Sequence, residues 1–433
     1  MNSAFKEFSL YDNIRSIPVL ADGLKPSQRK AIYGSQLRGE NAPELQVERL
    51  AAQISSQTDY HHGTGSMEST IIGMANNYAG SNNMNLFEPS GQFGSRLTKE
   101  AAAGRYIFTK FTPYFRQLFK KEDDSILEHL YVEGEKIEPK YYLPILPMML
   151  INGAQGTGTG HACLIMNYHP EQIRDAIVAC LNGKKLNHGS LVPWYRGFKG
   201  TIERNRETGQ VVITGKLEVV NSTTIKITEL PVGIYLDQYK EHLQKLEDTA
   251  FIKDFEDHST DETFEFICSV PRTTTALDIE ELYKRFKLIS RDTENLTLWD
   301  SDGVLNRFDT VEEIIEEFTE WRVQRYEDRR LKLISETEES INWASMKIRF
   351  IHFYLKNTKL FKDTGKKDLI TLLIENGFHE YDKLLAMPIW NLTRDKIEEL
   401  QKELDELQQT LSNLKEDTAV EMYKRELKQF KYN

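Results

Sequence analysis

Cysteine is scarce in this sequence, and long apolar runs are absent from it. Three cysteines, Cys163, Cys180 and Cys268, are spread widely over 433 residues. Such spacing excludes a disulfide framework and gives no Cys-rich zinc site. No apolar run approaches the length of a membrane span, and the first residues lack the charged-then-apolar pattern of a secretory signal. We therefore expect a protein of the reducing cytoplasm that makes no membrane contact.

An excess of basic residues is also lacking, because the net charge is −11. This value at first argues against a nucleic-acid partner. The acidity is uneven, however: residues 1–120 hold 13 Lys and Arg against 10 Asp and Glu, whereas the remainder holds 42 against 56. Acidic runs in helices are typical of solvated faces. Local clusters of basic residues, and not the net charge, therefore decide the partner.

The length and the change of pattern along the chain predict an α+β protein of about three domains. Residues 1–160 alternate short helical patterns with polar, glycine-rich loops. Residues 161–305 mix helices with strands, and residues 306–433 are nearly all helical. The strands of the middle part are expected at 199–203, 211–214 and 224–228.

Two helices are expected in the first part. One begins at Pro26, because proline suits the first turn of a helix. It carries Lys25, Arg29 and Lys30 at its start, where backbone N–H groups also favour an anion. The second, over residues 66–75, has apolar side chains on one face at helical spacing.

The last part carries the strongest periodicity of the chain. Its apolar positions are Ile397, Leu400, Leu404, Leu407, Leu411 and Leu414. Steps of three and four residues flanked by Glu and Lys are typical of a coiled-coil seam. We expect antiparallel arms at about 306–345 and 395–430 with a globule at about 346–394. Two ordinary amphipathic helices in a bundle fit the spacing equally well.

The run Tyr60-His61-His62-Gly63 invites a metal interpretation. Adjacent histidines rarely face one ion, and no third ligand stands at a usual spacing, so zinc is disfavoured. Contact with a phosphate at the start of a helix is the functional alternative. A histidine pair without a function is equally compatible with the sequence.

Two further segments look at first like ligand-binding motifs, but each lacks residues that such a motif needs. Residues 152–160 are glycine-rich but lack the Gly-Lys-Ser/Thr ending of a P-loop, so ATP binding by this chain is disfavoured. A tight loop that lets backbone approach another polymer fits this stretch better. Asp300 and Asp302 precede Gly303 without further acids at calcium-loop spacing, so we expect a turn there. No metal site is assigned.

The pair Arg105-Tyr106 combines a possible nucleophile with a fixed cation that can hold a phosphate. A lone pair of this kind is most often a surface cation beside a half-buried ring. A phenol with an ordinary pKa near ~10 is mostly protonated at neutral pH. Cleaving a phosphodiester with it needs charge stabilisation that one arginine barely supplies. If Tyr106 is catalytic, we expect the metal ligands on another polypeptide.

These segments together resemble the DNA-cleavage and rejoining region of type IIA DNA topoisomerases. The motifs that carry the resemblance occur in the family's order and run through nearly all of the chain. They are Arg15-Ser16-Ile17-Pro18, Asp22 to Lys30, Tyr60-His61-His62-Gly63, Gly80 to Leu86, Gly91 to Leu97, Arg105 to Thr109, Leu150 to Ala154, Phe198 to Ile202 and Met387-Pro388-Ile389-Trp390. The residues of these motifs are closer to those of the eukaryotic enzyme than to those of bacterial gyrase. The arrangement resembles the medium subunit of the topoisomerase of T-even-like bacteriophages, which would place the protein in the cytoplasm of a bacterial host.

The resemblance implies roles for individual residues. Tyr106 would attack the DNA backbone and hold its 5′ phosphate, Arg105 would steady that phosphate, and His62 would support the transition state. The other residues implied in DNA binding are Lys25, Arg29, Lys30, His61, Arg96 and Thr157.

The resemblance also implies a fold and partners. The fold would be a winged-helix domain with Tyr106, an α/β tower, and a coiled coil that ends in a dimer gate, the C-gate. Double-stranded DNA would be the substrate, and two copies would cut opposite strands. Mg²⁺ and ATP would be bound by a partner ATPase/TOPRIM subunit. The lack of a basic wrapping domain favours relaxation over supercoiling.

Two positions depart from the family pattern. Thr157 replaces the isoleucine that wedges between bases, which predicts a weaker or differently bonded wedge. Gly104 stands where relatives often carry proline or methionine, which predicts a looser approach to the nucleophile.

Two rival functions belong to other classes. One is an architectural DNA-binding dimer held by its coiled coil, with Tyr106 as an ordinary core residue. The other is a tyrosine recombinase, which needs two arginines and a histidine around a C-terminal tyrosine that this sequence does not offer.

Overall fold

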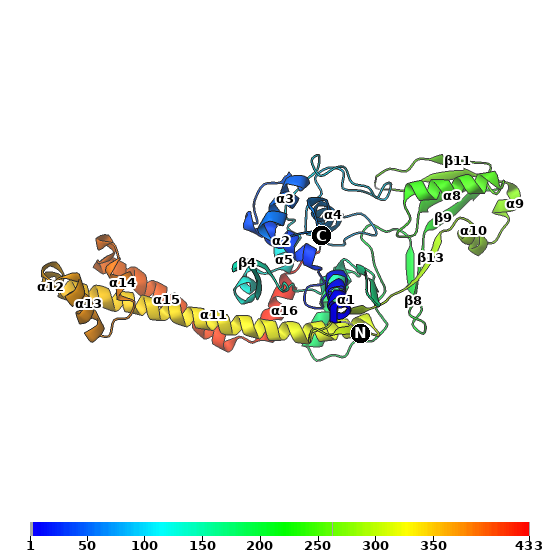
Figure 1. Cartoon of the computed structure of the whole chain (residues 1–433). Coiled ribbons are helices and arrows are strands. Elements are labelled where there is room, and N and C mark those ends of the chain that lie inside the picture. Colours follow the sequence, from blue (N-terminus) through cyan, green and yellow to red (C-terminus); the bar gives the residue numbers. More distant parts are fainter. Residues whose placement is uncertain (1–2, 262, 433) are drawn as a thin grey trace. The chain divides into compact units, whose positions relative to one another are not determined.

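The computed structural model describes residues 3–261 and 263–432 (Figure 1). The chain divides into two compact units. Residues up to 322 form the first together with those from 424 onward, and residues 323–423 form the second. Both helices and strands are present, as the sequence predicts, and the strands of the described residues lie in the first unit.

Short helices dominate residues 3–200 of the first unit. The helices are α1 (Ser3–Ser16), α2 (Pro26–Leu37), α3 (Val47–Gln57), α4 (Thr64–Ala75), α5 (Tyr114–Leu118), α6 (Met148–Ile151) and α7 (Pro170–Leu181), with a 3-10 turn at Lys121–Ile126. Antiparallel pairs are formed by β1 (Leu45–Gln46) with β2 (Phe108–Thr109), β3 (His129–Val132) with β4 (Glu135–Pro139), and β5 (Ala154–Gly158) with β6 (His161–Ile165). The β5–β6 pair spans the predicted domain boundary at residue 160.

The two helices expected in this part are confirmed. Helix α2 begins at Pro26, whose ring presets the helical φ. Helix α4 buries Met67, Ile71 and Met74, the face that the apolar spacing predicts. Helices α2 and α3 pack closely because Gly34 has no side chain: a Cβ there would lie 2.7 Å from Ile54 Cγ1.

Residues 198–308 hold two larger sheets of the first unit. The strands are β7 (Thr201–Arg204), β8 (Gln210–Thr214), β9 (Lys216–Asn221), β10 (Thr224–Glu229), β11 (Asp254–Asp257), β12 (Phe266–Ser269), β13 (Ile289–Thr293), β14 (Thr297–Trp299) and β15 (Leu305–Arg307). The helices are α8 (Leu236–Asp248), α9 (Arg272–Thr275) and α10 (Ile279–Arg285). One sheet has the order β11-β12-β10-β9 and the other β13-β8-β7.

The four-stranded sheet shows why this part of the chain forms strands. Along β10 buried residues alternate with half-buried ones, which is the two-residue period of a strand. Ile225 faces Cys268 and Ile227 faces Phe266 across the ladder, and α8 covers their buried face with Leu243 (Figure 1). The strands expected near 199–203, 211–214 and 224–228 are confirmed within two residues.

The predicted turn at Asp300 is also confirmed. It joins β14 to β15, and the Asp300 carboxylate accepts hydrogen bonds from the backbone N–H of Asp302 (3.1 Å) and of Val304 (2.8 Å). The carboxylate thus stabilises the turn itself.

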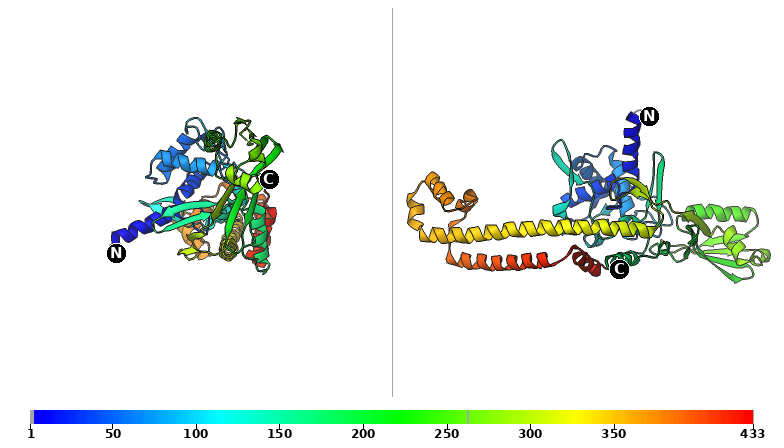
Figure 2. Two further views of the ribbon diagram at one scale, coloured as in Figure 1. Left: turned by 90° about the vertical axis from the view of Figure 1, so that its right-hand side faces the viewer. Right: turned by 90° about the horizontal axis from the view of Figure 1, so that it is seen from below.

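The second unit is built on two long helices. Its elements are most of α11 (Val311–Lys356), then α12 (Thr358–Asp363), α13 (Lys366–Glu375), α14 (Tyr381–Leu385), a 3-10 turn at Ile389–Asn391, α15 (Arg394–Glu416) and the start of α16 (Ala419–Gln429). Figure 2 shows α11 and α15 side by side. None of the described helices combines the length and the apolarity needed to cross a bilayer.

Helices α11 and α15 run antiparallel. Arg330 donates to the carbonyl of Leu414 (3.1 Å), whereas Phe350, further along α11, shares an apolar cluster with Leu400, which lies earlier on α15. Leu400 and Leu404 are buried, and the other four seam positions of α15 are half-buried, so the predicted apolar seam is the face that packs.

Candidate functional site

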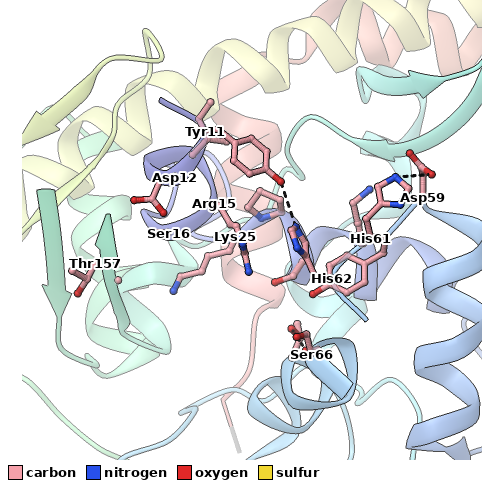
Figure 3. Close-up of a pocket in the computed structure, with 17 residues that line it drawn as sticks. Tyr11, Asp12, Arg15, Ser16, Lys25, Asp59, His61, His62, Ser66 and Thr157 are labelled. Atoms are coloured by element: carbon pink, nitrogen blue, oxygen red, sulfur yellow. Dashed lines mark hydrogen bonds and ion pairs between the residues drawn. The ribbon is translucent and has the colours of Figure 1, made fainter. Parts of the chain in front are cut away.

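A hollow of about 740 Å³ opens on the first unit between α1, α2, the loop before α4, α4 itself and β5 (Figure 3). Most of the residues that line it carry polar side chains. The structure brings five of the predicted site residues to this hollow: Lys25, Lys30, His61, His62 and Thr157. They come from three separate segments, and the tertiary fold alone unites them.

The β5–β6 hairpin reaches the hollow because two of its glycines lie against α1. A Cβ at Gly156 would collide with the carbonyl oxygen of Ser16, and one at Gly158 with the side-chain oxygen of Asn13. The glycine-rich stretch is therefore not the tight loop that the sequence predicts. Residues 154–158 form a strand, and the absent side chains admit this chain's own helix, not another polymer.

Thr157 is exposed near the end of β5, where it faces Ala162 across the hairpin. Its neighbour Thr159 binds α1: the Thr159 hydroxyl donates to Asp12 Oδ2 (2.7 Å), and its carbonyl accepts from Asn13 Nδ2 (3.2 Å). The hairpin is thus anchored to α1 through Thr159, and it presents the short β-branched side chain of Thr157.

Lys25 stands at the start of α2 and bridges to the hairpin. Its Nζ donates to the carbonyl of Gln155 (2.8 Å), and burial lowers the pKa of its ammonium group. Its backbone N–H is capped by Gln28 Oε1 (2.8 Å). The ammonium group lines the hollow, where it can meet an anion.

Arg29 does not reach this surface, contrary to the expectation that it binds phosphate. It is 6% exposed, and its guanidinium donates to both carboxylate oxygens of Asp22 (2.7 and 2.9 Å) and to the Leu24 carbonyl (2.8 Å). Asp22 also accepts from the backbone N–H of Tyr142 (2.9 Å). Because a buried charge needs a satisfied partner, this pair holds α2 to the core.

Lys30 and Arg96 are likewise bound within the chain. Lys30 Nζ lies 2.8 Å from Glu138 Oε1, and its side chain is only 15% exposed. Arg96 donates to Glu229 and to the Leu230 carbonyl (2.7 Å), and its guanidinium lies 4.4 Å from the Phe264 ring centroid. Both cations are therefore anchors between segments in this structure.

Tyr106 is 67% exposed, and the Arg105 guanidinium lies 4.9 Å from its ring centroid. The turn that carries them is tied to the start of α3. Glu48 N–H donates to the Gly104 carbonyl (3.2 Å), and Gln46 Nε2 donates to the Arg105 carbonyl (3.0 Å). The phenol is therefore presented to solvent from an anchored backbone.

Gly104 tightens this turn, which differs from the expected loosening. A Cβ at Gly104 would collide with the Glu68 carboxylate and lie 3.0 Å from Glu48 N. The glycine lets the turn approach α3 and α4 closely. Glu68, for which no motif predicted a role, lies next to the nucleophile turn for this reason.

Tyr106 and Arg105 are not among the described residues that line the hollow. His61 and His62 do line it, each with its own partner. His61 Nε2 lies 3.0 Å from Asp59 Oδ1, and His62 Nε2 lies 3.3 Å from the Tyr11 hydroxyl oxygen (Figure 3). The histidine pair therefore lines the hollow together with residues of α1 and α2.

No group of three or more His, Cys, Asp or Glu side chains within residues 3–261 and 263–432 has the geometry to hold a metal ion.

Sequence reasoning did not assign roles to Tyr11 and Arg15, both of which line the hollow from α1. Their spacing carries a signal that could have found them. Residues four apart share a helix face, so a basic residue before Pro18 and an aromatic one turn earlier point the same way.

Comparison with known proteins covers nearly the whole chain. Residues 15–428 match the family model of the DNA gyrase/topoisomerase IV A subunit. DNA topoisomerase 2-beta of Gallus gallus is 34% identical over 98% of this chain and 29% of its own length. DNA topoisomerase 2 of Plasmodium falciparum is 37% identical over 99% of this chain and 34% of its own length. This chain thus spans about a third of these relatives.

A solved structure gives the same picture. The DNA-binding, cleavage and re-ligation domain of Plasmodium falciparum topoisomerase II superposes with a TM-score of 0.90 at 37% identity, over 98% of this chain and 62% of that one. The relatives named here are eukaryotic, so the resemblance to a phage protein stays a prediction. The chain belongs to the family of the DNA gyrase/topoisomerase IV A subunit.

Proposed function

We propose that this chain is the DNA cleavage and rejoining part of an ATP-dependent type II DNA topoisomerase, an isomerase. The observation that carries the proposal is the exposed phenol of Tyr106 on an anchored turn, with the Arg105 guanidinium against its ring. The likeness to a DNA-binding, cleavage and re-ligation domain supports it.

In this mechanism the Tyr106 oxygen attacks a backbone phosphorus of DNA. The phenol loses its proton, a phosphotyrosine bond forms to the 5′ phosphate, and the bond to the 3′ oxygen breaks to leave a 3′ hydroxyl. Arg105 holds the phosphate that is attacked, since a guanidinium offers several fixed donors. Rejoining reverses these steps: the 3′ hydroxyl attacks the phosphotyrosine and the phenolate leaves. The ester conserves the bond, so rejoining needs no ATP.

The hollow supplies the contacts that hold the duplex. Lys25 and the histidines His61 and His62 present donors to backbone phosphates, which positions DNA without reading its sequence. His62 supports the charge that develops on the attacked phosphate. Thr157, exposed on its hairpin, meets the bases as a short wedge.

We assign Arg29, Lys30 and Arg96 supporting roles in place of direct phosphate contacts. Each is bound to a carboxylate of this chain, respectively Asp22, Glu138 and Glu229. They hold the segments on which the DNA-contacting residues stand.

Mg²⁺ and ATP belong, in this proposal, to a partner ATPase/TOPRIM polypeptide. Mg²⁺ supplies charge stabilisation at the phosphate when it is bound there. The residues of this chain supply the nucleophile and the cationic contacts.

The second unit supports a homodimer. Ile389 and Trp390, which lie in the 3-10 turn before α15, are each 76% exposed, and large exposed apolar side chains mark interaction sites. We propose that residues 1–160 act as the winged-helix domain, 161–305 as the tower, and 306–433 as the coiled coil with its C-gate. Two copies then cut opposite strands and pass a second duplex, with relaxation as the natural reaction.

The test is capture of the covalent intermediate. The protein is mixed with its ATPase/TOPRIM partner, Mg²⁺ and supercoiled DNA, and the reaction is quenched with denaturant. We expect protein joined to 5′ ends, and no adduct from Tyr106→Phe. Tyr131→Phe is the matched control, because Tyr131 is 66% exposed on β3.

Two results would contradict the proposal. An adduct from Tyr106→Phe equal to that of wild type excludes Tyr106 as the nucleophile. No adduct from wild type, together with normal DNA binding, favours the architectural DNA-binding dimer.

A further inference from the structure

Helix α1 joins the two walls of the hollow. Tyr11 reaches the loop before α4, where its hydroxyl oxygen lies 3.3 Å from His62 Nε2. One residue further, Asp12 accepts from the Thr159 hydroxyl on the β5–β6 hairpin (2.7 Å). The helix therefore contacts both the histidine loop and the hairpin that carries Thr157.

The His62 ring lies between two tyrosines. The Tyr60 ring meets it edge-on, with centroids 5.4 Å apart and planes at 74°. This contact restricts the tilt of the imidazole, and the Tyr11 hydroxyl engages one of its two nitrogens. Because each ring nitrogen of histidine is either donor or acceptor, engaging one determines what the other offers.

We propose that Tyr11 is a positioning residue for His62: its hydroxyl donates to Nε2 and keeps the proton of the neutral ring on Nδ1. The second nitrogen is then an N–H donor at neutral pH. The catalytic consequence rests on the proposed function, in which His62 faces a phosphate, whereas the tautomer itself does not.

The proton position matters because phosphate oxygens accept hydrogen bonds and do not donate them. A neutral imidazole has one N–H, and with Nε2 occupied by Tyr11 that N–H is directed to the other side. Without the Tyr11 hydroxyl, the ring is released to the Nε2–H tautomer, which places a lone pair on Nδ1.

Charged groups from three segments face the same hollow. They are Asp12 and Arg15 of α1, Lys25 and Lys30 of α2, and Asp59 and His61 of the histidine loop. A His61→Gln background leaves His62 as the one imidazole among the described residues that line the hollow.

The first test is spectroscopic and needs no partner or DNA. The chain is labelled with ¹⁵N-histidine, and the His62 resonances are assigned by their loss in His62→Gln. We expect the Nδ1–H tautomer in wild type at pH 8 and a shift toward Nε2–H in Tyr11→Phe, with Tyr131→Phe unchanged. An Nε2–H tautomer in wild type, or one that Tyr11→Phe does not alter, overturns the proposal.

The second test measures the rate of adduct formation with the ATPase/TOPRIM partner, Mg²⁺ and DNA. In the His61→Gln background, Tyr11→Phe should slow the reaction about tenfold at pH 8, the worth of one hydrogen bond. The slower rate should accompany the change of tautomer seen in the first test. A parent rate in Tyr11→Phe overturns the catalytic part. Absence of any wild-type adduct contradicts the proposed function and leaves the tautomer result standing.

Discussion

Arg29 and Arg105 are the same side chain in two opposite environments. Arg29 is 6% exposed and is bound to Asp22 through two hydrogen bonds. Arg105 is exposed, and its guanidinium lies against the Tyr106 ring. One therefore stabilises the fold, while the other remains accessible to a phosphate. A basic residue in a family motif is evidence of a binding role only when its surroundings leave it exposed.

Removing Arg29 should give the largest effect. Arg29→Ala leaves the Asp22 carboxylate buried without its cation, and breaking such a pair costs about 3–5 kcal/mol of unfolding free energy. Denaturant unfolding followed by circular dichroism measures this loss. Arg105→Ala is the matched control and should change stability by less than about 0.5 kcal/mol. Wild-type stability with weakened DNA binding in Arg29→Ala would instead restore its predicted role as a phosphate contact.

Arg105→Ala should show the reverse behaviour. Losing a cation that holds the attacked phosphate should slow adduct formation by about 10²–10³-fold without altering the melting temperature. Arg105→Lys should recover only part of the rate, because an ammonium group lacks the planar fork of donors. Single-turnover cleavage with the proposed ATPase/TOPRIM partner is the measurement. A full rate in Arg105→Ala is the contrary outcome.

Thr157→Ile should have a smaller effect, at the exposed end of β5. A longer apolar side chain unstacks a base step more effectively, so we expect a larger DNA bend and binding that is tighter by about 1 kcal/mol. Fluorescence energy transfer between the ends of a short duplex reports the bend. Thr157→Val keeps the size and removes the hydroxyl, so it distinguishes the effect of an apolar side chain from the effect of a longer one. Equal bending by all three proteins would contradict the wedge.

The smallest expected effect is the pH dependence of stability that three half-buried histidines cause. Burial lowers the pKa of His129, His169 and His242, so the folded protein resists protonating them. As the pH falls through the usual histidine range, near ~6.5, the unfolded chain binds more protons than the folded chain, because these three histidines protonate less readily when folded. Stability should therefore decline modestly between pH 7.5 and 5.5.

Thermal unfolding across that range measures the decline. Replacing these three half-buried histidines with glutamine should reduce the slope. A stability that rises toward acid pH would contradict the sign of these shifts.

Local patterns predicted the secondary structure well. The proline at the start of α2, the apolar face of α4 and the seam of α15 depend on residues within a few turns of one another, so the sequence alone reveals them. The glycine-rich residues 152–160 were misread as a loop. Their partner is α1, some 140 residues earlier, and no local pattern records that approach.

For the candidate site too, the sequence revealed the local motifs but not the contacts between distant segments. The order of its motifs identified Tyr106, Arg105 and the histidine pair as residues to examine, and their roles remain proposals. Sequence could not tell which basic residues are exposed, because Glu138 and Glu229, the partners of Lys30 and Arg96, stand more than 100 residues away. Nor could it connect Tyr11 with His62, which are 51 residues apart.

The sequence by itself determined the family, the main helices and strands, and the chemical groups available for cleavage, since these follow from short-range order. Only the tertiary structure decided which charges are paired within the chain and which face outward. Pairing depends on distance and burial, and both are created when remote segments pack together.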